Sequence, residues 1–398
     1  MRVLLFTGKG GVGKTTVAAA TAVHAARSGV KTLDASADAA HSLADGLGQP
    51  LGPDPVEIEP GLSAVHVDAR ARGERSWRAV QEYLIGVLDT LGVDPLAAEE
   101  LTVLPGAEEV LALLEIRDLV ARADHDLVVV DCAPSAETLR LLALPEALHR
   151  YLEASLPVER RVLRAMATGA RAARGGVPRP RDHVVEAAER LHAELTGVRE
   201  VLAGPDTSVR LVLTPEAMVI AEARRTLTAL ALYGYTVDGV VANRLMPADG
   251  EDGWRSGWAR AQAHRLVEAE VAFHPAPVLR LGYAAGEPIG PDALAELGAD
   301  LYGPDAVPGL LAPPGAALRL RVEREDDEFV RVLPMPDADR SEMSLARIGD
   351  DLAVQVAGHR RLLSLPSGLR RCTVVGARLA GGALRVRFRP DPTLWRVP

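Results

Sequence analysis

Cysteine and aromatic residues are scarce in this chain. It has two cysteines in 398 residues, and aromatic residues make up 4%. Cys132 and Cys372 stand far apart and no C-x-x-C pair occurs, which excludes a disulfide framework and a zinc knuckle. So few cysteines are typical of a reducing compartment, and we expect a cytoplasmic protein.

Long apolar runs and an excess of positive charge are missing too. No segment offers about 18 uninterrupted apolar residues, so no membrane span is expected. The first apolar stretch ends at Phe6, unlike that of a signal peptide. The formal net charge is -9, so the whole molecule is not expected to be attracted to nucleic acid.

A glycine loop stands between an apolar run and a helical pattern. The run Val3–Phe6 reads as a buried strand, and G-K-G-G-V-G-K-T-T follows from Gly8, which fits the phosphate-binding form G-x-x-x-x-G-K-S/T. Its backbone N–H groups would point at a phosphate, aided by the positive end of the next helix. A glycine-rich surface turn is the alternative. The predicted nucleotide-binding residues are Gly8, Gly10, Gly11, Val12, Gly13, Lys14, Thr15 and Thr16.

Two of these residues have expected roles in the chemistry. Lys14 would reach the β- and γ-phosphates, and the Thr15 hydroxyl would take one Mg²⁺ position. Asp131 ends the apolar run that begins at Leu127. A carboxylate at the end of a strand faces the phosphate loop, so Asp131 is predicted to hold Mg²⁺.

Strand-like and helix-like segments alternate over about the first 300 residues, which predicts an α/β fold with a parallel sheet. Asp34 would place a carboxylate inside a buried strand, which is costly. The stretches 75–123 and 145–203 are expected to form an α-helical subdomain. The expected strands are 3–6, 32–36, 127–131, 209–214 and 237–243, with helices at 17–27 and 220–232.

The composition changes after residue 305. Residues 306–316 are rich in proline and glycine and are predicted to be a linker between a domain at 1–305 and one at 317–398. Short alternating segments in the last part predict an antiparallel β-sandwich. Its L-P-x-x-L start at Leu365 and its G-x-L strand at Gly382 resemble the α-crystallin domain of small heat-shock proteins.

The extra lysine in K-G-G-V-G-K-T-T, Lys9, makes the loop similar to the deviant Walker A motif. The family with this motif includes ArsA-type ATPases, tail-anchored-protein targeting ATPases, Min and Par proteins and nitrogenase iron protein. The resemblance implies that the nucleotide is ATP and that the protein is a homodimer. In that family Lys9 would reach the partner's nucleotide and take part in catalysis with Lys14. A solvated lysine at the start of the loop is the alternative.

The segment S-A-D-A-A-H-S-L resembles the switch I sequence of the ArsA and targeting branch. The resemblance implies that Asp38 positions the attacking water and lies near the metal, a role that phosphoryl transfer requires. A helix N-cap is the alternative. The residues after Asp131 resemble switch II but depart from it at Cys132 and Glu137, which leaves its coupling to the helical subdomain open.

The resemblance also assigns the base. Asn243 matches the adenine-reading asparagine, since an amide offers one donor and one acceptor group. A simple turn residue is the alternative. Residues from Pro275 to Val278 are expected to form the loop over the adenine.

The branches of the family differ in residues that can be checked. Two distant cysteines cannot ligate an iron–sulfur cluster or capture arsenite. There is no zinc pair, and the six methionines do not suggest a Met-rich groove. The chain therefore resembles a zinc-free relative of the targeting ATPases with an appended α-crystallin-like domain.

That resemblance implies a Mg-dependent ATPase, a nucleotide-switched dimer that acts as a chaperone or targeting factor for hydrophobic client proteins. A client helix would lie between segments 83–88 and 142–148, unless these form the subdomain's own core. The alternatives are an energising subunit of an arsenite-like anion pump and a nucleotide-dependent assembly or regulatory switch. Peripheral membrane association stays open.

Overall fold

The computed structural model describes twelve stretches of the chain: residues 1–37, 41–67, 107–122, 124–132, 193–194, 196–248, 252–303, 307–315, 319–335, 338, 340–356 and 359–394. Contacts divide the chain into two units. One holds Met1–His66, Asp124–Leu139 and Pro205–Pro398, and the other holds Val67–Ala123 and Arg140–Gly204. The second unit corresponds to the two stretches in which we expect a helical subdomain, and most of it lies outside the described residues.

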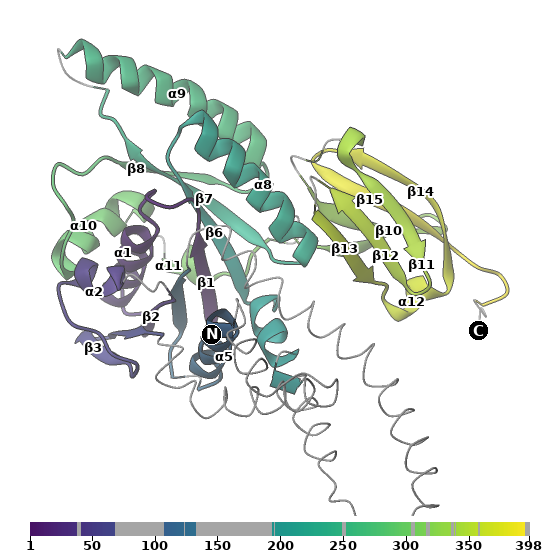
Figure 1. Ribbon diagram of the computed structural model, residues 1–398, viewed down its shortest axis with the longest axis horizontal. Helices are drawn as coiled ribbons and strands as arrows, with labels where there is room; N and C mark the ends of the chain where they lie inside the picture. The colour runs from purple at the N-terminus through teal and green to yellow at the C-terminus, as the bar shows by residue number, and fades with distance from the viewer. Residues whose placement is uncertain are drawn as a thin grey trace, which may run out of the picture. The chain divides into compact units, whose positions relative to one another are not determined.

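An eight-stranded sheet organises the first unit (Figure 1), in the order β3-β4-β2-β5-β1-β6-β7-β8. Every neighbouring pair is parallel except β3 and β4 at one edge. The predicted α/β class with a parallel sheet is confirmed. The strands are β1 (Arg2–Thr7), β2 (Thr32–Ser36), β3 (Val56–Glu59), β4 (Leu62–His66), β5 (Leu127–Asp131), β6 (Thr207–Leu213), β7 (Val237–Leu245) and β8 (Val278–Gly282).

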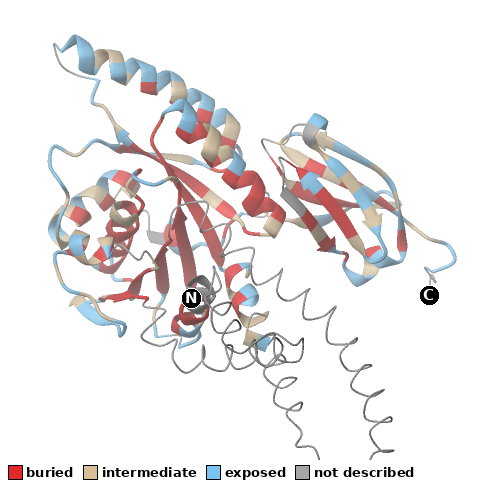
Figure 2. Ribbon diagram, in the orientation of Figure 1, coloured by how far each residue is buried: buried red, intermediate tan, exposed pale blue. Residues whose placement is uncertain are grey.

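The middle strands are buried along their whole length, as Figure 2 shows in red. Every residue of β1, β5 and β6 is buried. Strands covered by helices on both faces read as continuous apolar runs, which is why these segments could be recognised in the sequence. Strands β3 and β8 are only partly buried and have a weaker apolar pattern, and the sequence did not predict them.

Helices cover the sheet on both faces (Figure 1). On one face lie α1 (Lys14–Arg27), α2 (Ser42–Leu47) and α10 (Pro291–Tyr302), and on the other lie α8 (Ala217–Tyr233) and α9 (Gly253–Phe273). Helix α10 packs closely on α1 at Gly298. A Cβ atom there would lie 2.6 Å from the carbonyl oxygen of Ala20, so a side chain would force the two helices apart. Helix α5 (Ala107–Ala121) belongs to the second unit.

The C-terminal strands form two antiparallel sheets, as predicted. A four-stranded sheet has the order β14-β15-β10-β9 and a three-stranded sheet the order β11-β12-β13. Their apolar side chains share one core, which includes Leu333, Val354 and Phe388. The strands are β9 (Arg321–Glu325), β10 (Glu328–Pro334), β11 (Ser344–Ile348), β12 (Asp351–Val356), β13 (His359–Ser364), β14 (Cys372–Ala380) and β15 (Ala383–Pro390).

Short helices interrupt this part of the chain. Residues Val307–Leu311 form α11 within the stretch that we predicted to be a linker, and Leu310 is buried. Leu311 beside it is 36% exposed, and the linker and the domain bounds on either side of it stay a prediction. A 3₁₀ turn at Arg340–Glu342 and α12 (Ser367–Arg370) complete the elements. In the described part of the chain, no helix has the length and apolar character needed to traverse a bilayer.

Candidate functional site

The glycine loop joins β1, a central strand, to the start of α1 at the edge where the parallel strands end. Gly8 is required by close approach to the neighbouring strand, since a Cβ atom there would lie 2.1 Å from the carbonyl oxygen of Val212. Lys14 is buried, and its Nζ donates a hydrogen bond of 3.5 Å to the carbonyl oxygen of Lys9. The loop therefore has the strand–loop–helix context that the sequence predicts.

Thr15 and Asp131 meet beside the loop. The Thr15 hydroxyl donates to Oδ2 of Asp131 over 2.7 Å, and the Asp131 residue is fully buried. The Ser36 hydroxyl donates to the same oxygen over 3.5 Å, because Ser36 and Asp131 are paired in register. Hard oxygen ligands of this kind suit Mg²⁺. Ser36 was not predicted, although a hydroxyl at the end of the strand beside the Asp131 strand is a usable signal.

A second carboxyl group lies under the site. Asp34 of β2 is fully buried, and neither of its oxygens has a hydrogen-bond partner among the described residues. Burial raises the pKa of Asp34 well above its usual value, and the charge of Asp131 adds to the effect. The strand with an internal carboxyl is therefore real, and its carboxyl group favours the neutral form.

Lys9 of the loop lies near α8. Its Nζ is 3.8 Å from Oε2 of Glu222 on α8, and both side chains are about one-third exposed. The side chain is thus partly accessible at the surface. Its predicted role across a dimer interface stays a prediction.

The structure brings Asn243 to the loop but not Pro275. Asn243, near the end of β7, donates from Nδ2 to the carbonyl oxygen of Val12 over 2.8 Å. Pro275 precedes β8, and Pro277 beside it accepts a hydrogen bond from Val240 in β7. Pro275 therefore lies at the edge where the strands begin, away from the loop. The residue that follows β8 at the loop edge is Tyr283, whose N–H bonds to Leu245.

Some predicted features fall outside the described residues. These are Asp38, the switch II residues 133–140 and the client-binding segments 83–88 and 142–148. The N-cap of α2 is His41. The ring centroid of His41 lies 3.9 Å from that of His66, close to the end of β4.

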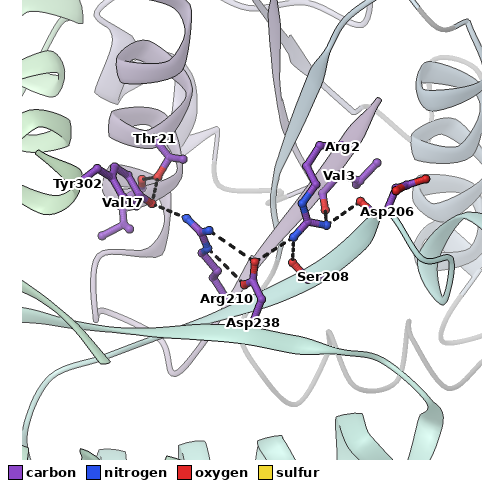
Figure 3. A network of polar contacts seen from close by, with 9 residues as sticks. All are labelled: Arg2, Val3, Val17, Thr21, Asp206, Ser208, Arg210, Asp238 and Tyr302. Atoms are coloured by element: carbon purple, nitrogen blue, oxygen red, sulfur yellow. Dashed lines mark hydrogen bonds and ion pairs between the residues drawn. The ribbon is translucent and has the colours of Figure 1, made fainter. Parts of the chain in front are cut away.

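The opposite edge of the sheet, where the strands begin, contains a polar network (Figure 3). Asp238 of β7 accepts from Nη2 of Arg2 over 2.9 Å and from Nε of Arg210 over 3.3 Å. Arg2 also donates to the carbonyl oxygen of Asp206 over 2.6 Å and to the Ser208 hydroxyl. One carboxylate therefore joins the guanidinium groups of two neighbouring strands.

The network continues from Arg210 to α10 and α1. Nη1 of Arg210 donates to the Tyr302 hydroxyl over 2.9 Å, and that hydroxyl lies 2.7 Å from Oγ1 of Thr21. Because Thr21 donates its own proton to Val17, Tyr302 is the donor to Thr21. Burial alone would lower the pKa of Arg210, but Tyr302 and Asp238 outweigh it and the pKa is raised.

Both cysteines are free and buried. Burial raises the pKa of the Cys132 thiol to about 12, with a contribution from Asp131 and an opposing one from Lys14. A thiol with so high a pKa is protonated at neutral pH. No group of three or more metal-ligating side chains of the His, Cys, Asp and Glu types occurs among the described residues.

Comparison with known proteins identifies both parts of the chain. Residues 1–303 match the model of the anion-transporting ATPase family, ArsA, and residues 326–388 match the HSP20-like domain found in ArsA. A protein of Streptomyces coelicolor named as uncharacterized is 43% identical over 99% of both chains. A Chlorobaculum tepidum protein named "Putative arsenical pump-driving ATPase" is 35% identical, over 93% of this chain and 91% of its own length.

Proposed function

The chain belongs to the anion-transporting ATPase (ArsA) family, and we propose that it is a Mg-dependent ATPase whose two copies close around ATP. The observation that carries this proposal is the 2.7 Å hydrogen bond between Thr15 and Asp131, beside the phosphate loop. The Thr15 hydroxyl and the Asp131 carboxylate are oxygen groups that suit Mg²⁺. They meet where the β- and γ-phosphates would lie. Mg²⁺ bound there would neutralise charge on the phosphates.

The protein's own residues have separate roles in this proposal. Backbone N–H groups of the loop and the Lys14 ammonium bind the phosphates, and Thr15 and Asp131 hold the metal. Asp38 orients the attacking water, and Lys9 reaches the nucleotide of a second copy. The water oxygen forms a bond to the γ-phosphorus as the bond to the bridging β–γ oxygen breaks, and release of inorganic phosphate then removes the charge that holds the copies together.

We further propose that this switch serves a chaperone or targeting role for hydrophobic client proteins. The HSP20-like domain and the presence of a second compact unit beside the sheet-bearing one in the chain support this proposal. Relatives named as arsenical pump-driving ATPases favour a second candidate, an energising subunit of an anion pump. The chain has only two cysteines, which stand far apart in the sequence and are both buried, and this argues against arsenite as its activator.

The nucleotide site is tested by Lys14→Ala. Loss of a charge-assisted contact should lower ATP affinity by about 10-fold to 100-fold or more in calorimetry. Lys31→Ala removes an exposed lysine on the same domain and should change nothing. Equal ATP affinity in both variants would remove Lys14 from the site.

Hydrolysis and assembly are tested separately. Asp38→Asn should bind ATP and slow its hydrolysis by about 10²-fold, and Lys9→Ala should bind ATP but hydrolyse it slowly. Light scattering should show a dimer with ATP in the Asp38→Asn variant. A wild-type chain that hydrolyses ATP as a monomer would contradict the dimer.

The two functions are separated by their activators. For a chaperone, a hydrophobic helical peptide should bind differently with and without ATP, while arsenite leaves hydrolysis unchanged. Hydrolysis stimulated by arsenite, without any nucleotide effect on peptide binding, would favour the pump.

A further inference from the structure

The Asn243 side chain is held between the phosphate loop and its own strand. Nδ2 donates to the carbonyl oxygen of Val12 over 2.8 Å, and Oδ1 accepts from the N–H of Arg244 over 2.8 Å. The residue is 6% exposed. Both ends of the amide are thus engaged by backbone groups, and the two bonds agree on which atom is nitrogen and which is oxygen.

The bond to Val12 fixes the orientation of one peptide group. The carbonyl of Val12 and the N–H of Gly13 belong to the same planar trans peptide and point in opposite directions. With the carbonyl held by Asn243, the N–H of Gly13 points away from Asn243. Gly13 is the N-cap of α1, and in a phosphate loop this N–H is one of the groups that bind the phosphates.

Gly13 and Asn243 fit each other. Gly13 has a φ of +89°, which side chains rarely adopt, and a Cβ atom there would lie 2.5 Å from Nδ2 of Asn243. The space that a side chain would fill is therefore occupied by the asparagine amide. The glycine of the motif thus allows this contact as well as the turn.

A second amide supports the first from α9. Gln262 donates from Nε2 to the carbonyl oxygen of Arg244 over 3.1 Å and accepts at Oε1 from the N–H of Met246 over 2.7 Å. Arg244 itself has a φ of +58°. Two uncharged amides therefore hold the end of β7 and connect α9 to the loop without competing for phosphate charge.

We propose that Asn243 is a positioning residue of the phosphate loop, which orients the Gly13 N–H toward the polyphosphate whatever base is bound. This inference rests on the proposed nucleotide site and goes beyond base reading. If it holds, the amide also affects the affinity for a polyphosphate that has no base. The probe that separates the two roles is inorganic tripolyphosphate with Mg²⁺.

The test measures the affinity of the full chain for MgATP and for Mg-tripolyphosphate by calorimetry. Asn243→Ala should weaken both by a similar factor of about 3 to 10, the effect of one hydrogen bond. Gln262→Leu, which leaves Asn243 in place, should weaken both by a smaller factor. Unchanged tripolyphosphate affinity in Asn243→Ala, with weaker ATP binding, would show that the amide only reads the base and would overturn the proposal.

A pH profile adds a readout that loss of packing would not produce. Asn243→Asp keeps the shape but points a carboxylate at the Val12 carbonyl, so tripolyphosphate affinity should fall by more than in Asn243→Ala near neutral pH. Protonation at about pH 4 to 5 restores a donor, and the affinity relative to wild type should recover. No recovery would contradict the positioning role. A wild-type chain that binds neither probe would instead overturn the nucleotide site itself.

Discussion

The eight-stranded sheet buries polar side chains both where its parallel strands begin and where they end, but the hydrogen bonds of these side chains are satisfied in different ways. Where the strands begin, Asp238 joins Arg2 and Arg210, and Tyr302 continues the chain of hydrogen bonds to α1. On the phosphate-loop side, the described residues leave both oxygens of Asp34, in the middle of β2, without a hydrogen bond. There the buried Lys14 ammonium reaches a carbonyl oxygen at 3.5 Å.

The difference indicates which edge serves stability and which serves binding. Buried polar groups are normally hydrogen-bonded, and a closed network contributes to the folded state. A buried lysine with a weak partner is instead suited to an anionic ligand. Variants in the network where the strands begin should therefore change stability and leave ATP affinity unchanged.

The largest expected effect is that of Asp238→Ala. It would leave two buried guanidinium groups without their shared carboxylate, so the free energy of unfolding should fall by about 3–5 kcal/mol. Urea unfolding measures this change, and calorimetry at a temperature where the variant is folded should give wild-type ATP affinity. A fall in ATP affinity without a loss of stability would show that the network where the strands begin serves binding and not stability.

Asp34→Val should act in the opposite direction. Valine suits a buried strand, has fewer side-chain heavy atoms than aspartate and removes a carboxyl group without partners among the described residues. The free energy of unfolding should rise by about 1–3 kcal/mol in urea titrations at pH 7. A loss of stability would mean that the carboxyl group is satisfied in the folded chain.

The same pair of proteins predicts a pH dependence. Because the folded-state pKa of Asp34 is raised by burial and by Asp131, the folded chain keeps this proton after the unfolded chain has released it at about pH 4. The stability of the wild type should therefore fall relative to Asp34→Val as pH rises from about 4. Urea midpoints at several pH values give the difference, and a constant difference would contradict the shift.

Tyr302→Phe should cost less than Asp238→Ala. It removes the hydroxyl that accepts from Arg210 and donates to Thr21 but keeps the ring. We expect the free energy of unfolding to fall by about 1–2 kcal/mol, with ATP affinity unchanged. Thermal unfolding of the two proteins side by side is sufficient, and an unchanged midpoint would show that the hydroxyl is dispensable.

The smallest effect is expected for Asp292→Ala, which serves as the exposed counterpart of Asp238→Ala. Asp292 is 96% exposed and pairs with Arg27 at 2.7 Å. A pair of this kind contributes about 0–1 kcal/mol and is weakened by salt. A urea titration that shows a loss as large as that of Asp238→Ala would refute the role given to burial.

The parts of the site that the sequence could predict share one property. The phosphate loop and Asp131 each follow an apolar run, and the ends of parallel strands meet at one edge. Ser36 was not predicted, but it left a usable signal, a hydroxyl at the end of the strand beside that of Asp131. Gln262 could not be found in this way, because its contacts depend on packing between distant elements. The same holds for Arg2 and Asp238, which are 236 positions apart.

The prediction for Pro275 was wrong for a related reason. Strand β8 has a short apolar pattern interrupted by Arg280 and was not recognised. Pro275 precedes β8, so it lies where the strands begin. Because β8 was not recognised, Pro275 was expected near the phosphate loop, where the strands end. For the parts of the fold that were predicted, buried strands and glycine loops provide strong local signals, whereas exposed edge strands do not.

The close fit of α10 against α1 at Gly298 has a mechanical meaning. The two backbones are in direct contact, so α1, which begins at the phosphate loop, cannot shift without moving α10. Helix α10 ends at Tyr302, and the HSP20-like region begins further along the chain, at residue 326. A displacement of α1 after phosphate cleavage would thus also move α10, and with it the start of the segment that leads to the HSP20-like region.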